Sequence, residues 1–236
     1  MKIDLHIHTN NSNDGIHDLK TMIKQAKKVG LKAIAITDHN KLLSFKKAKD
    51  LTKQYNILVI PGIEIGKIRF LNHLLALNIH KVPTYNNIID ILDFIINNGG
   101  VSIAPHPFSK IGFHNYSYYQ FNAVEAINGI NWLCNRRYKS QSKIPEIANS
   151  DAHAAYMLGY TWTEIESAET VEQVLENIRK GLCKPRGTFV PNHLTLKLFL
   201  TLSKRYIIKK FNIFNKKGCG YENTSYSNYL GIWTRI

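Results

Sequence analysis

Two histidines lie one residue apart near the start of the chain, in the stretch IDLHIHT. The apolar residues around His6 and His8 predict a β-strand, and side chains two residues apart on a strand point to the same side. A neutral imidazole nitrogen is a common metal ligand, so two imidazoles on one side of a strand suit a metal ion. The pair is therefore a candidate metal site, with a pair of core or surface histidines as the alternative.

Further imidazoles and carboxylates stand beside other apolar runs of the sequence. They are Asp14, His39, Glu64, His73, His106, Asp151 and His153. Closely spaced carboxylates repel one another and buried imidazoles need polar partners, so such a cluster is unfavourable unless cations lie within it. Divalent metal ions would satisfy both kinds of group. We therefore expect these residues to share one metal site with His6 and His8.

The candidate ligands can meet only if the fold brings distant segments to one place. Short apolar runs typical of strands alternate with stretches of helical periodicity. The expected strands cover residues 2–8, 32–39, 57–65, 73–79, 101–107, 123–128 and 146–153. The expected helices cover residues 18–30, 44–56, 84–100 and 170–181. This alternation predicts a parallel sheet, and the number of units suits a closed barrel, with an open doubly wound sheet as the alternative.

Two of the expected helices carry more detailed predictions. Thr170 and Gln173 have the spacing of a capping box at the start of the last helix. The helix within residues 84–100 is expected to present one apolar face, made of Ile88, Ile89, Leu92, Ile95 and Ile96. In a barrel the loops that follow the strands converge on one mouth, which is where the polar residues at the strand ends would gather.

Composition and cysteine usage narrow the class of protein. The 236 residues are 44% hydrophobic and 20% charged, as in a globular domain. No apolar run approaches the roughly 20 residues of a membrane-spanning helix, and the first residues lack the features of a secretory leader. The three cysteines, Cys134, Cys183 and Cys219, are widely spaced, which favours reduced thiols over disulfides. We expect a cytoplasmic protein.

The positive charge is concentrated near the C-terminus. The net charge is +14, and from Arg186 onward nine Lys or Arg residues stand against one acid, Glu222, which leaves +8 there and +6 elsewhere. Residues 193–211 alternate like a strand but are long enough for a basic amphipathic helix, and residues 216–236 have no clear period. This segment would bind a nucleic-acid backbone, contact an anionic membrane surface or pack on the barrel as an extra helix. Biased composition explains the charge equally well.

Six motifs resemble, in their order along the chain, the PHP (polymerase and histidinol phosphatase) superfamily of metal-dependent phosphoesterases. They are DLHIHTNNSNDG, AITDHN, PGIEI, NHLLALN, APHP and NSDAH, within residues 1–188. The resemblance implies a distorted (β/α)7 barrel with up to three divalent metal ions at the carboxyl ends of its strands. We therefore expect a PHP barrel at residues 1–190 and a basic extension at residues 191–236.

The resemblance also implies three groups of metal ligands. The first is His6, His8, Glu64 and Asp151; the second is Glu64, His73 and His106, with Glu64 as the bridge; the third is Asp14, His39 and His153. Many relatives place the acid of the first motif directly after the serine, whereas Asn13 comes between Ser12 and Asp14 here. A longer loop accommodates this difference, so Asp14 stays the expected ligand.

The activity that the resemblance implies is hydrolysis of a phosphate ester. A hydroxide bridging two divalent ions is a nucleophile near neutral pH, because such ions lower the pKa of bound water from about 15.7 to about 7. A third ion would hold the phosphoryl oxygens of the substrate. We expect Glu64, Asp151 and His153 to be the catalytic residues. Two to three ions of manganese, iron or zinc suit the mixed imidazole and carboxylate ligands.

The expected substrate is a small phosphomonoester, a nucleotide or the end of a nucleic-acid strand. Only 33 residues separate His73 from His106. Relatives similar to nucleotide phosphatases and 5′-to-3′ exoribonucleases carry an extra domain in this interval. Its absence predicts an open mouth, compatible with a small ester or with a strand end.

Residues behind the metal site and around the substrate are expected as well. Asp38 would orient an imidazole, or alternatively cap the following turn, and Glu125 and Asn149 would also lie behind the ligands. Substrate phosphate would be contacted by Lys110, Arg136 and Arg137, for which solvated surface charge is the alternative.

Two rival classes share parts of this pattern. A non-catalytic metal-binding scaffold or nucleic-acid-binding module would keep the barrel but usually loses ligands, and all nine positions are filled here. An amidohydrolase-like metallohydrolase also has an HxH pair and a late aspartate, but lacks the TDH and PGxE segments.

Overall fold

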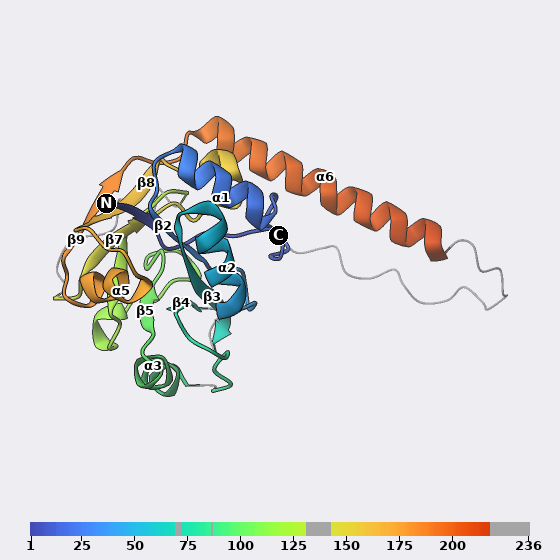
Figure 1. Ribbon diagram of the computed structural model, residues 1–236. Helices are drawn as coiled ribbons and strands as arrows, with labels where there is room; N and C mark the ends of the chain where they lie inside the picture. The colour runs from blue at the N-terminus through green and yellow to red at the C-terminus, as the bar shows by residue number, and fades with distance from the viewer. Residues whose placement is uncertain (69–71, 86, 131–142, 218–236) are drawn as a thin grey trace. The chain divides into compact units, whose positions relative to one another are not determined.

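The structure, a computed structural model, describes residues 1–68, 72–85, 87–130 and 143–217 (Figure 1). The chain divides into two compact units, Met1–Leu198 and Phe199–Ile236. The candidate ligands all lie in the first unit. Arg136, Arg137, Cys134 and Cys219 lie outside the described residues, as do residues 218–236.

One mixed sheet forms the centre of the first unit. Its strands in the described residues are β1 (Lys2–Asp4), β2 (Ala33–Ile36), β3 (Leu58–Ile68), β4 (Asn72–Leu77), β5 (Val101–Ala104), β6 (Ala123–Asn128), β7 (Glu146–Asn149), β8 (Thr161–Ile165) and β9 (Cys183–Gly187). Their order across the sheet is β7-β6-β5-β4-β3-β2-β1-β8-β9. Strands that follow one another in sequence are therefore neighbours from β1 to β7, as in a barrel.

The sheet curls until its two ends nearly meet. Thr163 of β8 bridges to β7, because its hydroxyl donates to the carbonyl of Ala148 at 2.7 Å and accepts from the amide of Ala148 at 2.9 Å. The expected barrel is confirmed, and the open sheet is excluded. Its distortion is also visible, because β4 runs antiparallel to both β3 and β5, and β8 runs antiparallel to both β1 and β9.

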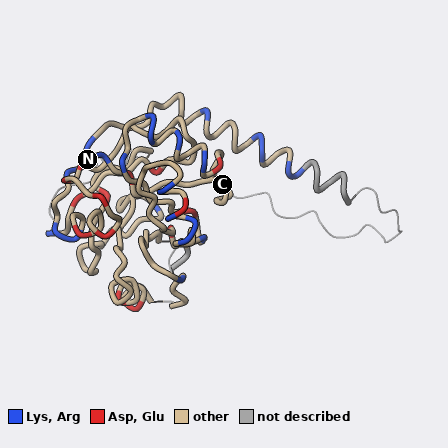
Figure 2. Tube along the Cα trace, viewed as in Figure 1, with Lys and Arg blue, Asp and Glu red and all other residues tan. Residues whose placement is uncertain are grey.

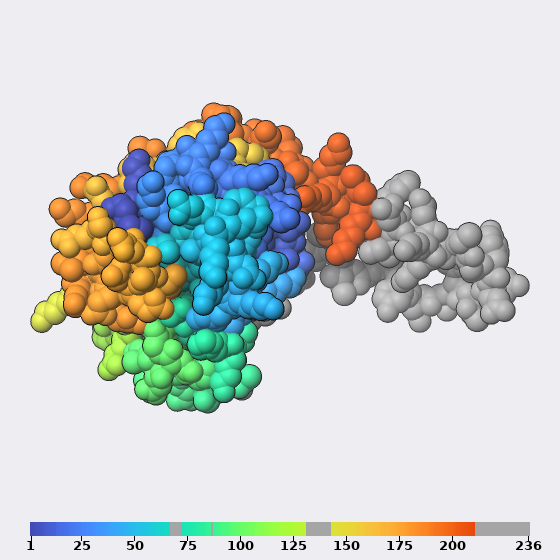
Figure 3. All heavy atoms as spheres, in the orientation of Figure 1, coloured from blue at the N-terminus to red at the C-terminus, as the bar shows by residue number. Residues whose placement is uncertain are grey.

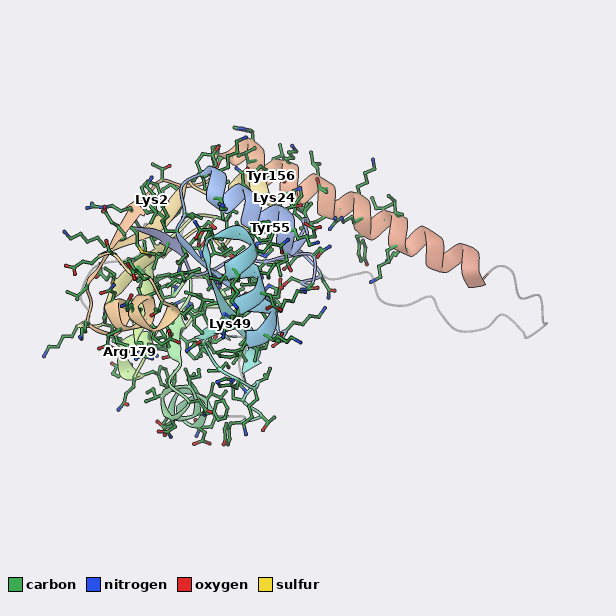
Figure 4. The ribbon with its side chains drawn as sticks, viewed as in Figure 1. Lys2, Lys24, Lys49, Tyr55, Tyr156 and Arg179 are labelled. Atoms are coloured by element: carbon green, nitrogen blue, oxygen red, sulfur yellow. The ribbon has the colours of Figure 1, made fainter. Side chains whose placement is uncertain are left out.

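Helices lie between or after the strands along the chain. They are α1 (Leu19–Lys28), α2 (Phe45–Tyr55), α3 (Ile88–Asn97), α5 (Val171–Arg179) and α6 (Asn192–Lys217), with short 3-10 helices η1 (Tyr116–Tyr118) and η2 (Ala155–Met157). Figure 3 shows α1 and α2 side by side on the face in view. The exposed Lys24 of α1 and Lys49 of α2 point outward from that face (Figure 4).

Side chains begin the helices at the places that the sequence marks. Asp18 accepts from the amide of Thr21 at the start of α1, and Ser44 accepts from Lys47 at the start of α2. The predicted capping box of α5 is confirmed, with Thr170 and Gln173 bonding to each other's backbone. Such caps satisfy amide groups that the first helical turn leaves without partners.

The apolar core continues from the barrel interior into α5. Side chains of β1, β2 and β3 (Ile3, Ala35 and Ile60 among them) pack in one cluster with Val174 and Ile178 of α5. Arg179 adds a polar contact, because Nη2 donates to the carbonyl of Gly99 at 2.6 Å (Figure 4). The helix α5 thus packs against the strands at the end of the barrel that lies opposite the candidate ligands.

Three predictions of local structure need correction. β1 ends at Asp4, so His6 and His8 follow the strand instead of lying on it. The buried face of α3 is Ile91, Leu92 and Ile95, whereas Ile89 and Ile96 are exposed. Strands β8 and β9 were not predicted.

The segment near the C-terminus is a helix over most of its described length. α6 runs from Asn192 to Lys217, which excludes the alternative of a strand at residues 193–211. Among the described residues we find no helix with the length and hydropathy needed to span a bilayer.

Candidate metal centre

All nine predicted ligands converge at the carboxyl ends of the parallel strands. The histidine pair follows β1 and Asp14 lies on the loop beyond it; His39 follows β2, Glu64 lies within β3, and His73 lies within β4. His106 follows β5, and Asp151 and His153 follow β7. Bridges of the backbone between Ile7 and Ala152 and between His39 and Glu64 draw these segments together beyond the strands.

Glu64 is the centre of the cluster. Its carboxylate is 1% exposed. Oε1 lies 2.6 Å from Nδ1 of His73 and 3.3 Å from Nε2 of His106. Oε2 lies 3.0 Å from Nδ1 of His39 and 3.2 Å from Nε2 of His8. One carboxylate therefore faces imidazoles from four separate segments, which is the arrangement expected of a bridging ligand.

Asp151 forms a second meeting point beside the histidine pair. Its Oδ1 lies 3.4 Å from Nε2 of His6 and 3.5 Å from Nε2 of His8. Its Oδ2 accepts a hydrogen bond from Nδ2 of Asn128 at 3.1 Å, which fixes the orientation of the carboxylate. Asp151 has a φ of 54°, in the left-handed region that few residues other than glycine adopt. Its neighbours hold it in this conformation.

Asp14 stands at the outer edge of the cluster. Its Oδ2 lies 3.2 Å from Nε2 of His39 and 3.4 Å from Nε2 of His153. The loop that carries it turns back so tightly that a Cβ atom on Gly15 would lie 1.8 Å from the carbonyl oxygen of Thr9. Glycine is therefore required there, and the loop containing the extra Asn13 still brings Asp14 to the histidines.

Four sets of these side chains have ligand atoms within 4.8 Å of one another. They are His8 with Asp14, His39 and His153; His6 with His8 and Asp151; His6 with Glu64 and His106; and His39 with Glu64 and His73. The predicted third group lies within one set, whereas the predicted first group is divided, because Glu64 joins His6 in a different set from His8 and Asp151. In the predicted second group, His73 and His106 each reach Glu64, but in different sets.

The cluster shifts the pKa values of its members in opposite directions. Burial lowers the pKa of His6, but the carboxylates of Asp151, Glu125 and Glu64 outweigh it and raise this pKa well above its ordinary value. Burial likewise lowers the pKa of His39, but Asp14 and Glu64 raise it to about 10. Burial raises the pKa of Glu64, but the imidazoles, His6 foremost, bring it well below its usual range. The site therefore favours anionic carboxylates with positive charge among them.

A divalent metal fits this arrangement. Nδ1 of His6 bonds to Glu125 at 2.8 Å, and Nδ1 of His8 bonds to Ser12 at 3.3 Å. These bonds turn both Nε2 atoms toward each other, 3.1 Å apart. Two lone pairs at that distance repel unless a proton or a cation lies beside them. Oδ1 of Asp14 is buried and makes no hydrogen bond within the described residues, and Oε2 of Glu64 faces imidazole nitrogens, so both oxygens suit a cation.

Glu125 holds two of the histidines from behind. Oε1 accepts from Nδ1 of His6 at 2.8 Å and from Nδ2 of Asn149 at 2.9 Å. Oε2 accepts from the amide of His106 at 2.8 Å and from Nδ2 of Asn128 at 2.9 Å. Asn149 also accepts from the amide of Leu5 at 2.8 Å. Glu125 and Asn149 thus lie behind the candidate ligands, where the sequence predicted them.

Asp38 reaches an imidazole through an intermediary that sequence reasoning missed. Its Oδ1 accepts from the hydroxyl of Ser12 at 3.1 Å, and that oxygen accepts from Nδ1 of His8 at 3.3 Å and from the amide of His39 at 2.8 Å. Ser12 therefore fixes the tautomer of His8 and the position of His39. Its presence in the first motif, two residues before Asp14, is the only sequence signal for this role. Asn128 was also missed.

Among the three candidates for substrate contact, Lys110 lies within the described residues. Lys110 is exposed on the loop that follows His106. Ser109 of the same loop bonds to Nδ1 of His106 at 2.8 Å, so the loop supports a candidate ligand. Contact of Lys110 with substrate stays a prediction.

A nearly closed α/β barrel with imidazoles and carboxylates gathered at the carboxyl ends of its strands defines a class, the metal-dependent hydrolases built on barrels. Comparison with known proteins narrows the class. A family model described as the PHP domain matches residues 4–185. The chain belongs to the PHP domain family, and the family implies divalent metal. The resemblance read from the six motifs is confirmed.

Individual relatives agree with this assignment. An uncharacterized protein of Methanocaldococcus jannaschii is 35% identical over 127 residues, which are 47% of this chain and 70% of that protein. The PolC-type DNA polymerase III of Lactococcus lactis is 42% identical over 68 residues, 28% of this chain but only 4% of the polymerase.

Among solved structures, a two-domain protein from Bacteroides vulgatus, described as containing a predicted PHP-like metal-dependent phosphoesterase, aligns with a TM-score of 0.62. It is 19% identical, and the match covers 80% of this chain and 65% of that one. At this identity the similarity concerns the fold, which is that of the PHP-like metal-dependent phosphoesterases.

Proposed function

We propose that the protein hydrolyses phosphate esters with two or three divalent metal ions held by the nine clustered side chains. One observation carries the proposal: the Nε2 atoms of His6 and His8 face each other at 3.1 Å, beside the carboxylates of Glu64 and Asp151. Manganese, iron and zinc all accept this mixture of imidazole and carboxylate ligands. Bound ions supply a water nucleophile of lowered pKa and neutralise phosphoryl oxygens.

Buried and exposed side chains of the site have different roles in this proposal. Glu64 and Asp151 are nearly inaccessible and stay ionised because imidazoles surround them, so they serve as the anionic ligands. The side chains of Asp14, His39 and His153 are 39%, 26% and 10% exposed, and substrate approaches from their side. His153 donates from Nδ1 to the carbonyl of Asp151 at 2.9 Å. Its Nε2 therefore faces Oδ2 of Asp14, at 3.4 Å, on the more exposed side of the cluster.

The substrate class follows from the shape of the rim and from one relative. The 32 residues between His73 and His106 hold only the rest of β4, then α3 and β5 among their described elements. No inserted domain is seen there in the described residues, so the rim is open to a small phosphomonoester or to a strand end. The similarity to a DNA polymerase over 68 residues favours a nucleotide or nucleic-acid end.

We further propose that residues 1–190 form the catalytic barrel and residues 191–236 an extension. The family match to residues 4–185 and the division of the chain after Leu198 support this boundary.

The proposal is tested on the purified chain by elemental analysis together with a substrate panel. The panel contains a generic phosphomonoester, mononucleotides, and single-stranded RNA and DNA carrying 5′-phosphates. We expect bound manganese, iron or zinc and turnover of at least one substrate, with both reduced in Asp151→Ala. Unchanged metal content and unchanged turnover in that variant would contradict the proposal.

The same panel separates the rival classes. A scaffold would bind metal without turning over any phosphate ester. An amidohydrolase-like enzyme would leave the panel intact and hydrolyse amides.

A further inference from the structure

Helix α6 is strongly basic along its whole length. Its 26 residues, from Asn192 to Lys217, contain no Asp or Glu. Their basic residues are Lys197, Lys204, Arg205, Lys209, Lys210, Lys216 and Lys217. Figure 2 shows Lys and Arg recurring along the described part of the helix, without an acidic side chain among them. Such a helix is complementary to an anionic partner.

The helix is also apolar on two faces. Leu194, Leu198 and Leu202, four residues apart, form one face; Leu198 is 7% exposed and the other two are half-buried. A second set has the spacing i, i+3, i+4 and i+11, which places it on one stripe of a helix. This outer stripe is Leu196, Phe199, Leu200 and Ile207, exposed by 57%, 66%, 58% and 64%.

The outer stripe lies on the other side of the helix from the first face at 100° per residue. Large apolar side chains gathered in one exposed stripe mark an interaction surface. At 100° per residue, Lys197 and Lys204 border one edge of the stripe, and Lys210 lies within it, about 20° from Phe199. Nζ of Lys210 stands 5.2 Å from the centre of the Tyr206 ring, which is 61% exposed beside the stripe.

We propose that the outer stripe of α6 binds the surface of a membrane that contains anionic lipids, with the helix lying in the plane of the headgroups. Leu196, Phe199, Leu200 and Ile207 enter the acyl boundary, and the bordering lysines contact lipid phosphates, an arrangement typical of interfacial helices. α6 does not span a bilayer, in agreement with its hydropathy.

Two other partners fit the helix less well. A second copy of the chain would bring two helices together that carry positive charge and no acid, so like charges would repel. A nucleic-acid backbone would take the lysines but leaves the aliphatic stripe in water, since phosphate contacts need no Leu or Ile. The membrane surface satisfies both the charge and the apolar stripe. This inference goes beyond the proposed hydrolysis and does not depend on it.

The test uses the full chain and sedimentation with vesicles. Vesicles of phosphatidylglycerol and phosphatidylcholine in equal parts are compared with vesicles of phosphatidylcholine alone. We expect binding to the anionic vesicles, weakened by salt because the Debye length shortens. The double variant Phe199→Gln/Ile207→Gln keeps the charge and is expected to lower the affinity about tenfold for each side chain.

A matched control separates the stripe from general surface hydrophobicity. Ile89→Gln removes an isoleucine of α3 that is 56% exposed and should leave vesicle binding unchanged. Lys197→Gln/Lys204→Gln should weaken binding to anionic vesicles. Thermal melts of all variants should match that of the unmodified chain, because the altered side chains are exposed.

Three results would overturn the inference. The first is no binding to anionic vesicles. The second is binding that Phe199→Gln/Ile207→Gln leaves intact. The third is a dimer, seen by light scattering, that this double variant dissociates. A short RNA serves as the competing anion, and RNA binding without vesicle binding would likewise assign the helix to nucleic acid.

Discussion

The two ends of the barrel differ in how their ionisable groups are buried. At the carboxyl ends of the parallel strands, ionisable groups are buried against one another, and Glu64, His6 and His8 have exposures of 1%, 0% and 0%. At the amino ends the surface has cavities, but the charged side chains there are exposed to water. A cavity of about 430 Å³ is lined by Glu164, Arg186 and Cys183 among others, and one of about 460 Å³ by Met1, Lys32 and Ile57 among others.

The contrast teaches that an open cavity is not the mark of this site. Glu164 and Arg186 form a salt bridge of 2.8 Å at the amino end, but each side chain is 49% exposed. Water screens such a pair, so the salt bridge contributes little to the stability of the fold. At the carboxyl end four sets of side chains hold their ligand atoms within 4.8 Å of one another, a spacing that suits ions. Buried charges that satisfy one another only in part are the better guide to function.

The largest expected effect comes from a substitution at the carboxyl end of the barrel. The same substitution at the amino end is its control. Glu64→Gln removes the charge that faces five imidazoles, and we expect loss of bound metal and a fall in phosphoesterase turnover on the order of a thousandfold. Glu164→Gln is the matched control and should change neither quantity. Elemental analysis and steady-state kinetics measure both. Equal effects of the two substitutions would remove the distinction between the ends.

A smaller effect is expected one layer behind the ligands. Ser12→Ala removes the hydroxyl between Asp38 and His8, so the imidazole loses the partner that fixes its tautomer. We expect metal affinity to fall by about 10–100-fold, measured by competition with a chelator. Ser44→Ala is the control: it removes the cap of α2, which lowers stability by about 1 kcal/mol, but leaves metal affinity unchanged. A comparable loss of affinity in both variants would assign Ser12 a purely structural role.

Protons and metal ions should compete at the carboxyl end. The pKa of His39 in the metal-free protein is raised to about 10, so its imidazole is protonated at neutral pH and must lose that proton to bind a metal. Metal affinity should therefore rise with pH below this value, by about tenfold per unit for each proton released. Calorimetric titration in buffers of different ionisation enthalpy counts the protons. Binding without proton release would contradict this charge state.

The smallest effect concerns the stability of the metal-free protein. The pKa values of Glu64 and Asp151 are lowered, so their contribution is present above about pH 4.5 and is lost as the pH falls further. His39 has a raised pKa, so its contribution is complete below its ordinary value of 6.5 and is lost as the pH rises toward about 10.

Burial also raises the pKa of Asp4 from 3.8 to about 7, and this contribution is lost progressively as the pH rises from the first value to the second. The melting temperature without metal should therefore be highest near pH 4.5 and decline toward alkaline pH, with changes of about 2–4 °C for each kcal/mol. Differential scanning calorimetry in the presence of a chelator measures this profile. A profile that is flat from acid to alkaline pH would show that these charges do not contribute.

Much of the site could be predicted because short motifs keep their residues together. The pair His6 and His8 needs only the spacing of an extended backbone to present both rings on one side. This holds although β1 ends at Asp4, since the chain stays extended through the bridge between Ile7 and Ala152. The metal-binding role of the nine residues stays a prediction, but their convergence is observed.

Other features could not be predicted because they depend on contacts between distant segments. The roles of Ser12 and Asn128 come from hydrogen bonds to Asp38 and Asp151, each 23 or more residues away in sequence. The face of α3 that becomes buried is decided by the barrel, so Ile91 replaces Ile89 and Ile96 in the core. The antiparallel pair β8 and β9 closes the barrel, and its short strands carry no strong alternation.

The sequence by itself determined which chemical groups this protein has and which strand end carries each of them, because ligand type and local spacing are properties of neighbouring residues. The tertiary structure alone decided which imidazole meets which carboxylate and how far their pKa values move. These outcomes depend on distances and burial, which arise only when the sheet curls and brings remote segments together.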